Sequence, residues 1–193
     1  MSAALSGTVL AAFGRQYKVR LEDGSLLLCY PRAKKSEVAC GDRVELLKSS
    51  ADQGVIERIQ PRKSLFYRAD QWKEKLIAAN VSQVVIVVAT EPGFSDDLVS
   101  RCLCAAEAQE IRSLVVLNKC DLPEQLDIAR ALLAPIKAAG FEVMELSAMQ
   151  DVSALRERLA GELNLFVGQS GMGKSTLTNA LIPEADARTR EIS

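Results

Sequence analysis

Residues 168–176 read Gly-Gln-Ser-Gly-Met-Gly-Lys-Ser-Thr and match the pattern G-x-x-x-x-G-K-[ST]. A strand-like run (163–167) precedes them and a helical run (174–181) follows, which is the setting that a phosphate-binding loop requires. Glycines let the backbone fold around a phosphate with its N–H groups pointing inward, and the positive end of the next helix attracts the anion. The stretch therefore predicts a nucleotide-phosphate site.

Each residue of this loop is a candidate ligand contact. Lys174 is expected to reach the β- and γ-phosphates, and the Ser175 hydroxyl is expected to coordinate Mg²⁺. These two residues are the catalytic candidates. The predicted phosphate-binding set is Gly168, Gln169, Ser170, Gly171, Met172, Gly173, Lys174, Ser175 and Thr176.

Strands and helices alternate upstream of the loop, from residue 81 onward. Strands are predicted at 84–89, 114–117, 141–146 and 163–167, and helices at 96–110, 124–139, after a capping Asp151, and at 174–181. The first two strands are apolar throughout, as strands buried on both faces of a parallel sheet must be. This pattern predicts a doubly wound α/β domain, whose ligands bind at the carboxyl ends of the strands.

Two short motifs follow the second and third of these strands. Asn118-Lys-Cys-Asp121 fits N-K-x-D, the guanine-reading motif of GTPases, and Ser147-Ala148 fits the S-A signature whose backbone N–H meets guanine O6. The Asp121 carboxylate can accept hydrogen bonds from guanine N1–H and the exocyclic amine, which adenine does not offer. The predicted base-binding residues are Asn118, Lys119, Cys120, Asp121, Ser147 and Ala148.

The order of the motifs is rotated. In most GTPases the phosphate loop precedes D-x-x-G, N-K-x-D and S-A, whereas here it comes last, which predicts a circularly permuted domain. No D-x-x-G occurs in the 193 residues, so we expect a piece of a longer protein, truncated at its C-terminus, with negligible GTP hydrolysis on its own.

The first 61 residues have a different sequence pattern, with short strand-like runs at 6–10, 17–21, 25–30, 41–47 and 54–59. Five short strands in so small a segment predict a closed barrel, with the OB-fold as the leading candidate. We therefore expect an RNA-binding OB-fold over 1–61, a connector over 62–80 and the permuted GTPase domain over 81–193. A plain β-domain that docks onto protein is the alternative for the first segment.

Charge is divided unevenly along the chain. Residues 1–66 carry 11 Lys and Arg against 7 Asp and Glu, whereas residues 67–193 have a net charge of −5. A basic barrel favours a polyanionic partner, although a charge of this size is also common on an ordinary solvated surface. The phosphate-contact candidates are Arg15, Lys18, Arg20, Arg32, Lys34, Lys35 and Arg43. Phe13, Tyr17 and Tyr30 can stack on bases or fill the barrel.

Composition excludes several classes of protein. The chain has no histidine, so Ser-His-Asp, Cys-His and His-zinc chemistry are excluded within these residues. Five scattered cysteines predict reduced thiols. The longest apolar run, Val84–Ala89, is too short to cross a bilayer, and the N-terminus does not have the pattern of a secretion signal. We expect a cytoplasmic monomer without a membrane partner.

The chain resembles the RsgA (YjeQ) family of permuted GTPases. The resemblance covers nearly the whole chain and rests on Gly41-Asp-Arg-Val44 together with residues 118–121, 147–148 and 168–176. It implies an OB-fold that contacts rRNA and a GTPase, with GTP/GDP and Mg²⁺ bound, that is stimulated by the small ribosomal subunit in late maturation. It also implies a C-terminal zinc domain, for which this chain offers no ligands.

Two rival functions remain open from the sequence. One is a P-loop ATPase or a kinase of a small substrate, which the N-K-x-D motif disfavours. The other is a nucleotide-sensing RNA-binding protein without significant turnover.

Overall fold

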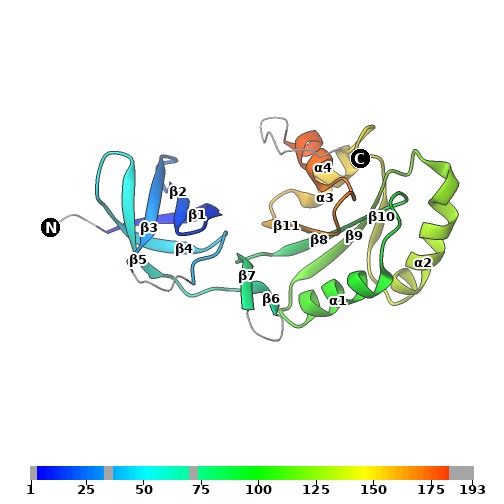
Figure 1. The fold of residues 1–193 in the computed structure, drawn as a ribbon, viewed down its shortest axis with the longest axis horizontal. Coiled ribbons are helices and arrows are strands. Elements are labelled where there is room, and N and C mark those ends of the chain that lie inside the picture. The colour runs from blue at the N-terminus through cyan, green and yellow to red at the C-terminus, as the bar shows by residue number, and fades with distance from the viewer. Residues whose placement is uncertain (1–3, 33–36, 70–73, 183–193) are drawn as a thin grey trace. The chain divides into compact units, whose positions relative to one another are not determined.

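A computed structural model describes residues 4–32, 37–69 and 74–182. The chain divides into two compact units, Met1–Val81 and Ser82–Ser193 (Figure 1). Each unit has its own sheet and its own core.

The first unit contains a closed five-stranded barrel. Its strands are β1 (Leu5–Phe13), β2 (Gln16–Leu21), β3 (Leu26–Pro31), β4 (Arg43–Lys48) and β5 (Gln53–Ile59). They pair in the order β1-β2-β3-β5-β4 and close by β1–β4 pairing, and only the β3–β5 pair is parallel. This is an OB-type barrel, as the five short strands predicted.

Alternating residues of these strands build the barrel core. In β2, Tyr17, Val19 and Leu21 point inward, while the residues between them are exposed. Tyr17 is only 3% exposed and belongs to the core cluster, so of its two predicted roles it fills the barrel and does not stack on a base. Cys29 is also buried here, and burial raises the pKa of its thiol to about 11, which keeps it protonated and inert.

A β-hairpin occupies most of the segment that was predicted only as a connector. It consists of β6 (Leu65–Ala69) and β7 (Glu74–Ala79), and Ala79 N–H donates to the carbonyl of Cys40 at 2.7 Å. The register shifts between Phe66 and Tyr67, so inward and outward positions do not alternate regularly along β6. Because strand prediction relies on an alternation of polar and apolar residues with a period of two, this irregular strand is not detected from the sequence.

A buried ion pair fixes the start of β4. Asp42 is fully buried and accepts two hydrogen bonds from the Arg62 guanidinium, at 2.7 and 2.8 Å, and a third from Ala39 N–H at 2.8 Å. Arg62 also donates to the carbonyl of Glu37. The paired arginine therefore joins the end of the barrel to the loop that enters β4.

Replacing Asp42 by asparagine is expected to lower the free energy of unfolding by about 3 kcal/mol, because Arg62 then loses its counter-ion in a largely buried place. Urea denaturation followed by far-UV circular dichroism measures this. The matched control is Glu57→Gln, which breaks the exposed pair with Arg32 and should cost less than about 1 kcal/mol. Equal losses of unfolding free energy in the two variants would contradict a special stabilising role for the buried Asp42–Arg62 pair.

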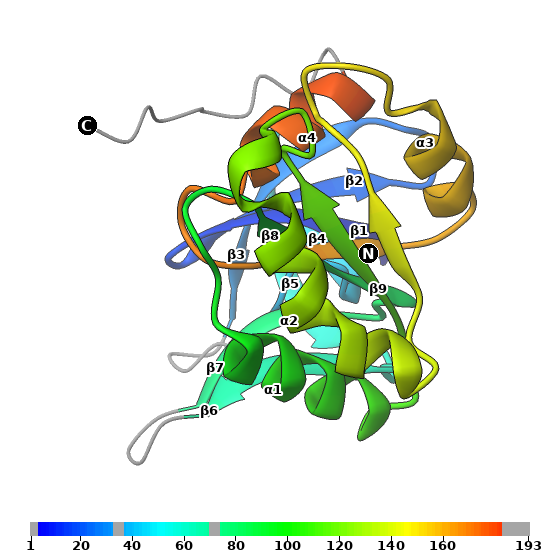
Figure 2. The same ribbon diagram turned by 90° about the vertical axis from the view of Figure 1, so that its right-hand side faces the viewer.

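The second unit is a parallel sheet with helices on both faces. Its strands are β8 (Gln83–Ala89), β9 (Arg112–Asn118), β10 (Val143–Glu145) and β11 (Asn164–Val167), in the order β10-β9-β8-β11. Its helices are α1 (Asp96–Glu107), the 3-10 turn η1 (Pro123–Gln125), α2 (Leu126–Ala138), α3 (Ser153–Leu159) and α4 (Lys174–Leu181). Helices α1 and α2 cover one face and α3 and α4 the other (Figures 1 and 2).

Several element ends differ from the predicted ones. Helix α1 ends at Glu107, three residues early, and Glu110 beyond it has a positive φ of 53°. Helix α3 begins at Ser153 with Val152 as its N-cap, although Asp151 still accepts from Ser153 N–H at 2.8 Å. No helix among the described residues is long and apolar enough to cross a membrane.

Candidate nucleotide-binding site

The predicted motifs meet at one edge of the parallel sheet. Strands β8, β9, β10 and β11 run in the same direction, so their carboxyl ends share that edge. The segments that follow β9, β10 and β11 are the N-K-x-D motif, the S-A motif and the phosphate loop. Parallel pairing therefore brings Asn118 to Ala148, 30 positions away in sequence, and to Met172, 54 positions away.

Asn118 joins these three segments. Its side chain is 1% exposed. The amide nitrogen donates to the carbonyl of Met172 at 3.0 Å, and the amide oxygen accepts from Ala148 N–H at 2.9 Å. One buried amide thus holds the phosphate loop and the S-A loop in fixed positions.

A cavity of about 300 Å³ opens beside this amide. Asp121 lies exposed on its lining, while Ser147 and Ala148 are buried. The full lining is Asn118, Lys119, Asp121, Leu122, Ser147, Ala148, Met149, Gly173 and Thr176. The cavity lining therefore combines an exposed carboxylate with buried polar groups, the kind of lining that orients a small polar ligand.

The backbone of the N-K-x-D motif is held by its neighbours. Lys119 adopts a positive φ of 61°, and its carbonyl accepts from the Thr90 hydroxyl at 2.9 Å. The Lys119 ammonium donates to the carbonyl of Glu91 at 2.6 Å. Cys120 does not line the cavity, because its thiol donates back to the carbonyl of Leu117 at 3.2 Å. Burial raises the pKa of that thiol.

Two glycines of the phosphate loop are required by close approach. Gly168 has a φ of 149°, and a Cβ there would lie 2.2 Å from the carbonyl oxygen of Val87. Gly173 has a φ of 84°, and a Cβ there would lie 2.3 Å from the amide nitrogen of Asn118. Both positions exclude any side chain, so the loop packs tightly on β8 and on Asn118.

Lys174 lies across this loop. Its ammonium donates to the carbonyls of Gly168 at 2.8 Å and Gln169 at 2.5 Å, and burial lowers its pKa. Ser175 and Thr176 follow in the first turn of α4, where backbone N–H groups have no partner within the helix. The positive charge and the free N–H groups together suit an anionic phosphate.

The remaining loop residues have different places. Gln169 and Ser170 are exposed, and the side chain of Gln169 accepts from Ser95 N–H at 3.4 Å. Met172 is buried, so only its backbone supports the site, through the bond to Asn118.

Ser175 fits the metal role that its motif predicts. Its hydroxyl is the kind of hard oxygen ligand that Mg²⁺ takes, with phosphate oxygens and waters completing the coordination. Among the described residues, no group of three or more His, Cys, Asp or Glu side chains is placed to hold a metal ion by itself. The ligands of a bound Mg²⁺ would therefore come partly from the protein and partly from the nucleotide.

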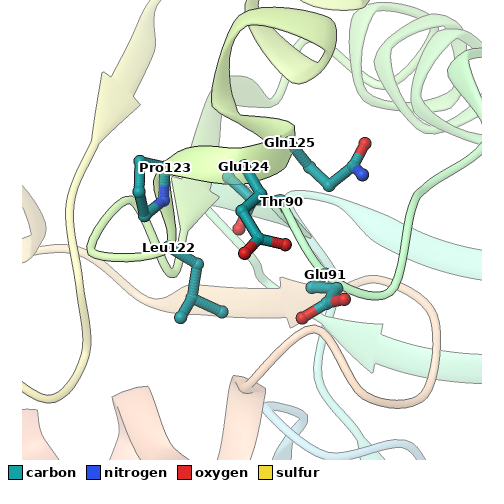
Figure 3. Close-up of a pocket in the computed structure, with 6 residues that line it drawn as sticks. All are labelled: Thr90, Glu91, Leu122, Pro123, Glu124 and Gln125. Carbon is teal, nitrogen blue, oxygen red and sulfur yellow. The ribbon is translucent and has the colours of Figure 1, made fainter.

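A second, smaller pocket of about 180 Å³ borders the segment that follows the N-K-x-D motif. Its lining includes Glu91 and Glu124, whose carboxylates Figure 3 shows, together with Thr90, Leu122, Pro123 and Gln125. The negative charges of the Glu91 and Glu124 carboxylates repel a phosphate group. This pocket adjoins the larger cavity at Leu122, which lines both.

The sequence did not single out Thr90, Leu122 or Met149. Thr90 supports Lys119 through a hydrogen bond, and Leu122 and Met149 line the larger cavity. For Leu122 and Met149, the only signal in the sequence was their position directly after the N-K-x-D and S-A motifs. Thr90, one residue past the end of β8, is a position where the α/β architecture expects ligand contacts.

The barrel's predicted RNA contacts are partly accessible. Arg15, Lys18, Arg20, Arg32 and Arg43 are exposed, whereas Lys34 and Lys35 lie outside the described residues. Phe13 is 63% exposed, and Tyr30 is half-buried and accepts from Gln16 at 3.2 Å. These residues gather on the barrel unit and not at the nucleotide cavity.

Comparison with known proteins gives a consistent result. Residues 59–193 match the family model of the RsgA GTPase. The chain is 57% identical over 192 residues to the "Small ribosomal subunit biogenesis GTPase RsgA" of Burkholderia pseudomallei (strain K96243), covering 97% of this chain and 61% of that protein. It is 52% identical over 197 residues to the protein of that name from Paraburkholderia phytofirmans, covering all of this chain and 62% of that protein.

Two solved structures share the fold. YjeQ from Thermotoga maritima superposes with a TM-score of 0.73 at 30% identity, over 94% of this chain and 66% of that one. YloQ, described as a circularly permuted GTPase, gives 0.66 at 25% identity, over 94% and 65%. The predicted class, an OB-type barrel followed by a permuted GTPase domain, is confirmed. The chain spans about 61% of the length of the curated relatives it matches.

Proposed function

Because the chain belongs to the RsgA GTPase family, we propose that it binds GTP and GDP and that its full-length protein hydrolyses GTP in biogenesis of the small ribosomal subunit. We place this activity in late maturation in the cytoplasm, by a monomer that the small subunit stimulates. The barrel contacts rRNA. For the zinc domain that the family implies, the described part of the chain offers no group of three or more Cys, His, Asp or Glu side chains.

The observation that carries the nucleotide proposal is the pair of hydrogen bonds made by buried Asn118. They fix the base subsite, where Asp121 lies, against the loop that receives phosphates. A guanine in the cavity offers two N–H donors to the Asp121 carboxylate, and adenine offers none in those positions. Base choice and phosphate binding therefore depend on one rigid arrangement.

Phosphate binding uses groups that are already in place. Lys174 holds a positive charge at the loop, and a phosphate replaces the carbonyls to which its ammonium now donates. The helix N-terminus stabilises the same negative charge. Ser175 would hold Mg²⁺, which neutralises charge on the β- and γ-phosphate oxygens when bound.

Competition against a fluorescent GDP analogue tests the proposal. GTP and GDP are expected to displace it at concentrations at least about a hundredfold below that required of ATP, because ATP leaves the Asp121 carboxylate unpaired. ATP binding within tenfold of GTP would favour the ATPase or kinase alternative. Adding purified small subunits to the full-length protein should raise the GTP turnover rate, and no rise would contradict the ribosomal role.

A further inference from the structure

A polar hollow of about 480 Å³ lies on the outer face of the barrel, and only Arg43 of its lining belongs to a motif discussed above, Gly41–Val44. Three small residues of β1, Ser6–Thr8, lie along it, between the longer side chains of Arg20 and Glu22 on one side and Arg43 and Gln60 on the other. Small residues flanked by long ones create the depression.

The strand register sets its two arginines in one row. Thr8 pairs with Arg20 in β2 and with Arg43 in β4. Paired residues point to the same face of a sheet, and neighbouring strands lie about 4.8 Å apart, so the two arginine Cα atoms are separated by about 10 Å. Gln60 N–H donates to the carbonyl of Arg43 at 2.8 Å, which holds Gln60 at the end of the row.

These two arginines are also free to bind a ligand. Other arginines of this unit are paired: Arg32 with Glu57, Arg58 with Glu45 and Arg62 with Asp42. No described carboxylate lies within 4.0 Å of the Arg20 or Arg43 guanidinium. Arg20 and Arg43 therefore present charges at the hollow that no described carboxylate pairs, whereas carboxylates neutralise the three paired arginines.

We infer that the hollow binds the sugar–phosphate backbone of single-stranded RNA, with Arg20 and Arg43 each contacting a phosphate. Thr8 supplies a neutral hydrogen-bonding group between the two charges, and Gln60, whose side chain also hydrogen-bonds Glu45, lies beside them. A closed barrel of this type binds single strands along a charged groove. The inference rests on the proposed function because it takes RNA to be the partner of the barrel.

Glu22 gives the proposed track a direction. Its carboxylate lies in the same hollow, on the Arg20 side, and repels a phosphate. The strand therefore passes over the Arg20–Thr8–Arg43 row toward Gln60 and away from Glu22. Removing this one negative charge should strengthen binding, which is the opposite of the effect expected at the arginines.

Fluorescence anisotropy of a labelled oligouridylate of about twelve nucleotides, titrated with the 193-residue chain at several salt concentrations, tests the inference. Arg20→Gln and Arg43→Gln should each weaken binding about five- to tenfold and reduce the salt slope by about 0.7. Glu22→Gln should tighten binding about twofold. Arg32→Gln removes the same charge from a paired arginine whose side chain is 72% exposed, and should change the affinity less than about twofold.

The outcomes separate this inference from the proposed function. If the chain binds RNA and Arg32→Gln is as damaging as Arg20→Gln, or Glu22→Gln weakens binding, the hollow is not the RNA track, although RNA remains the partner. If the wild-type chain binds neither the oligouridylate nor purified small subunits, the inference and the rRNA part of the proposed function both fail. GTP affinity, measured on the same samples, should be unchanged in all four variants and also reports that they are folded.

Discussion

Replacing Asp121 by asparagine is expected to weaken GTP binding about a thousandfold and to create a preference for xanthosine nucleotides. Two charge-assisted hydrogen bonds to guanine are lost, each contributing about 2 kcal/mol, which together correspond to roughly three powers of ten in affinity. An asparagine amide instead offers a donor to the carbonyl that xanthine carries in place of the guanine amine. The exposed position of Asp121 in the cavity means that the substitution leaves the fold intact.

Displacement of a fluorescent GDP or XDP analogue measures both affinities. The matched control is Asp127→Asn, which removes a carboxylate that is 97% exposed on α2 and does not line the cavity. The control should bind GTP as the wild type does. A variant at 121 that keeps GTP affinity within tenfold would remove the physical basis for guanine recognition at this cavity.

Replacing Gly173 by alanine is expected to lower GTP and GDP affinity about a hundredfold. The added methyl group would lie 2.3 Å from the Asn118 amide nitrogen and would impose a left-handed backbone on an alanine. Asn118 cannot move aside without losing its bonds to Met172 and Ala148, so both loops lose their common support.

The control for this variant is Gly140→Ala. Gly140 also has a positive φ, of 94°, but a Cβ there meets nothing within 4 Å. The two substitutions share the backbone strain, and only the one at 173 adds the collision. Calorimetric titration should find near-normal nucleotide affinity in the control, and equal losses in both would show that strain and not the contact with Asn118 is responsible.

Much of this molecule could be predicted because its signals are local. The apolar run at 84–89 and the glycine loop at 168–173 each specify an element and its surroundings within a few residues. The β6–β7 hairpin could not be predicted, because its irregular register at Phe66 breaks the alternation on which strand prediction depends. The role of Tyr17 stayed open between base stacking and core packing for a related reason, since the sequence of a short strand does not show which face a tyrosine occupies.

The site shows the same division. Motifs identified Asn118 and Asp121, but only the three-dimensional structure shows that Asn118 is fully buried and holds two loops. The pairing of Arg32 with Glu57 is likewise a contact between neighbouring strand segments 25 positions apart in sequence, which no local pattern encodes. Long-range pairing therefore decides which basic residues remain available.

The two hydrogen bonds of Asn118 make the base and phosphate subsites thermodynamically linked. Whatever stabilises the loop at residues 168–173 also stabilises the position of Ala148, and linkage requires the effect to be equal in the reverse direction. A partner that pulls on either loop thus lowers the affinity for the whole nucleotide and not for one end of it. In the proposed site, release of a bound nucleotide is therefore expected to respond to a pull on the Ser147–Ala148 loop as well as to one on the phosphate loop.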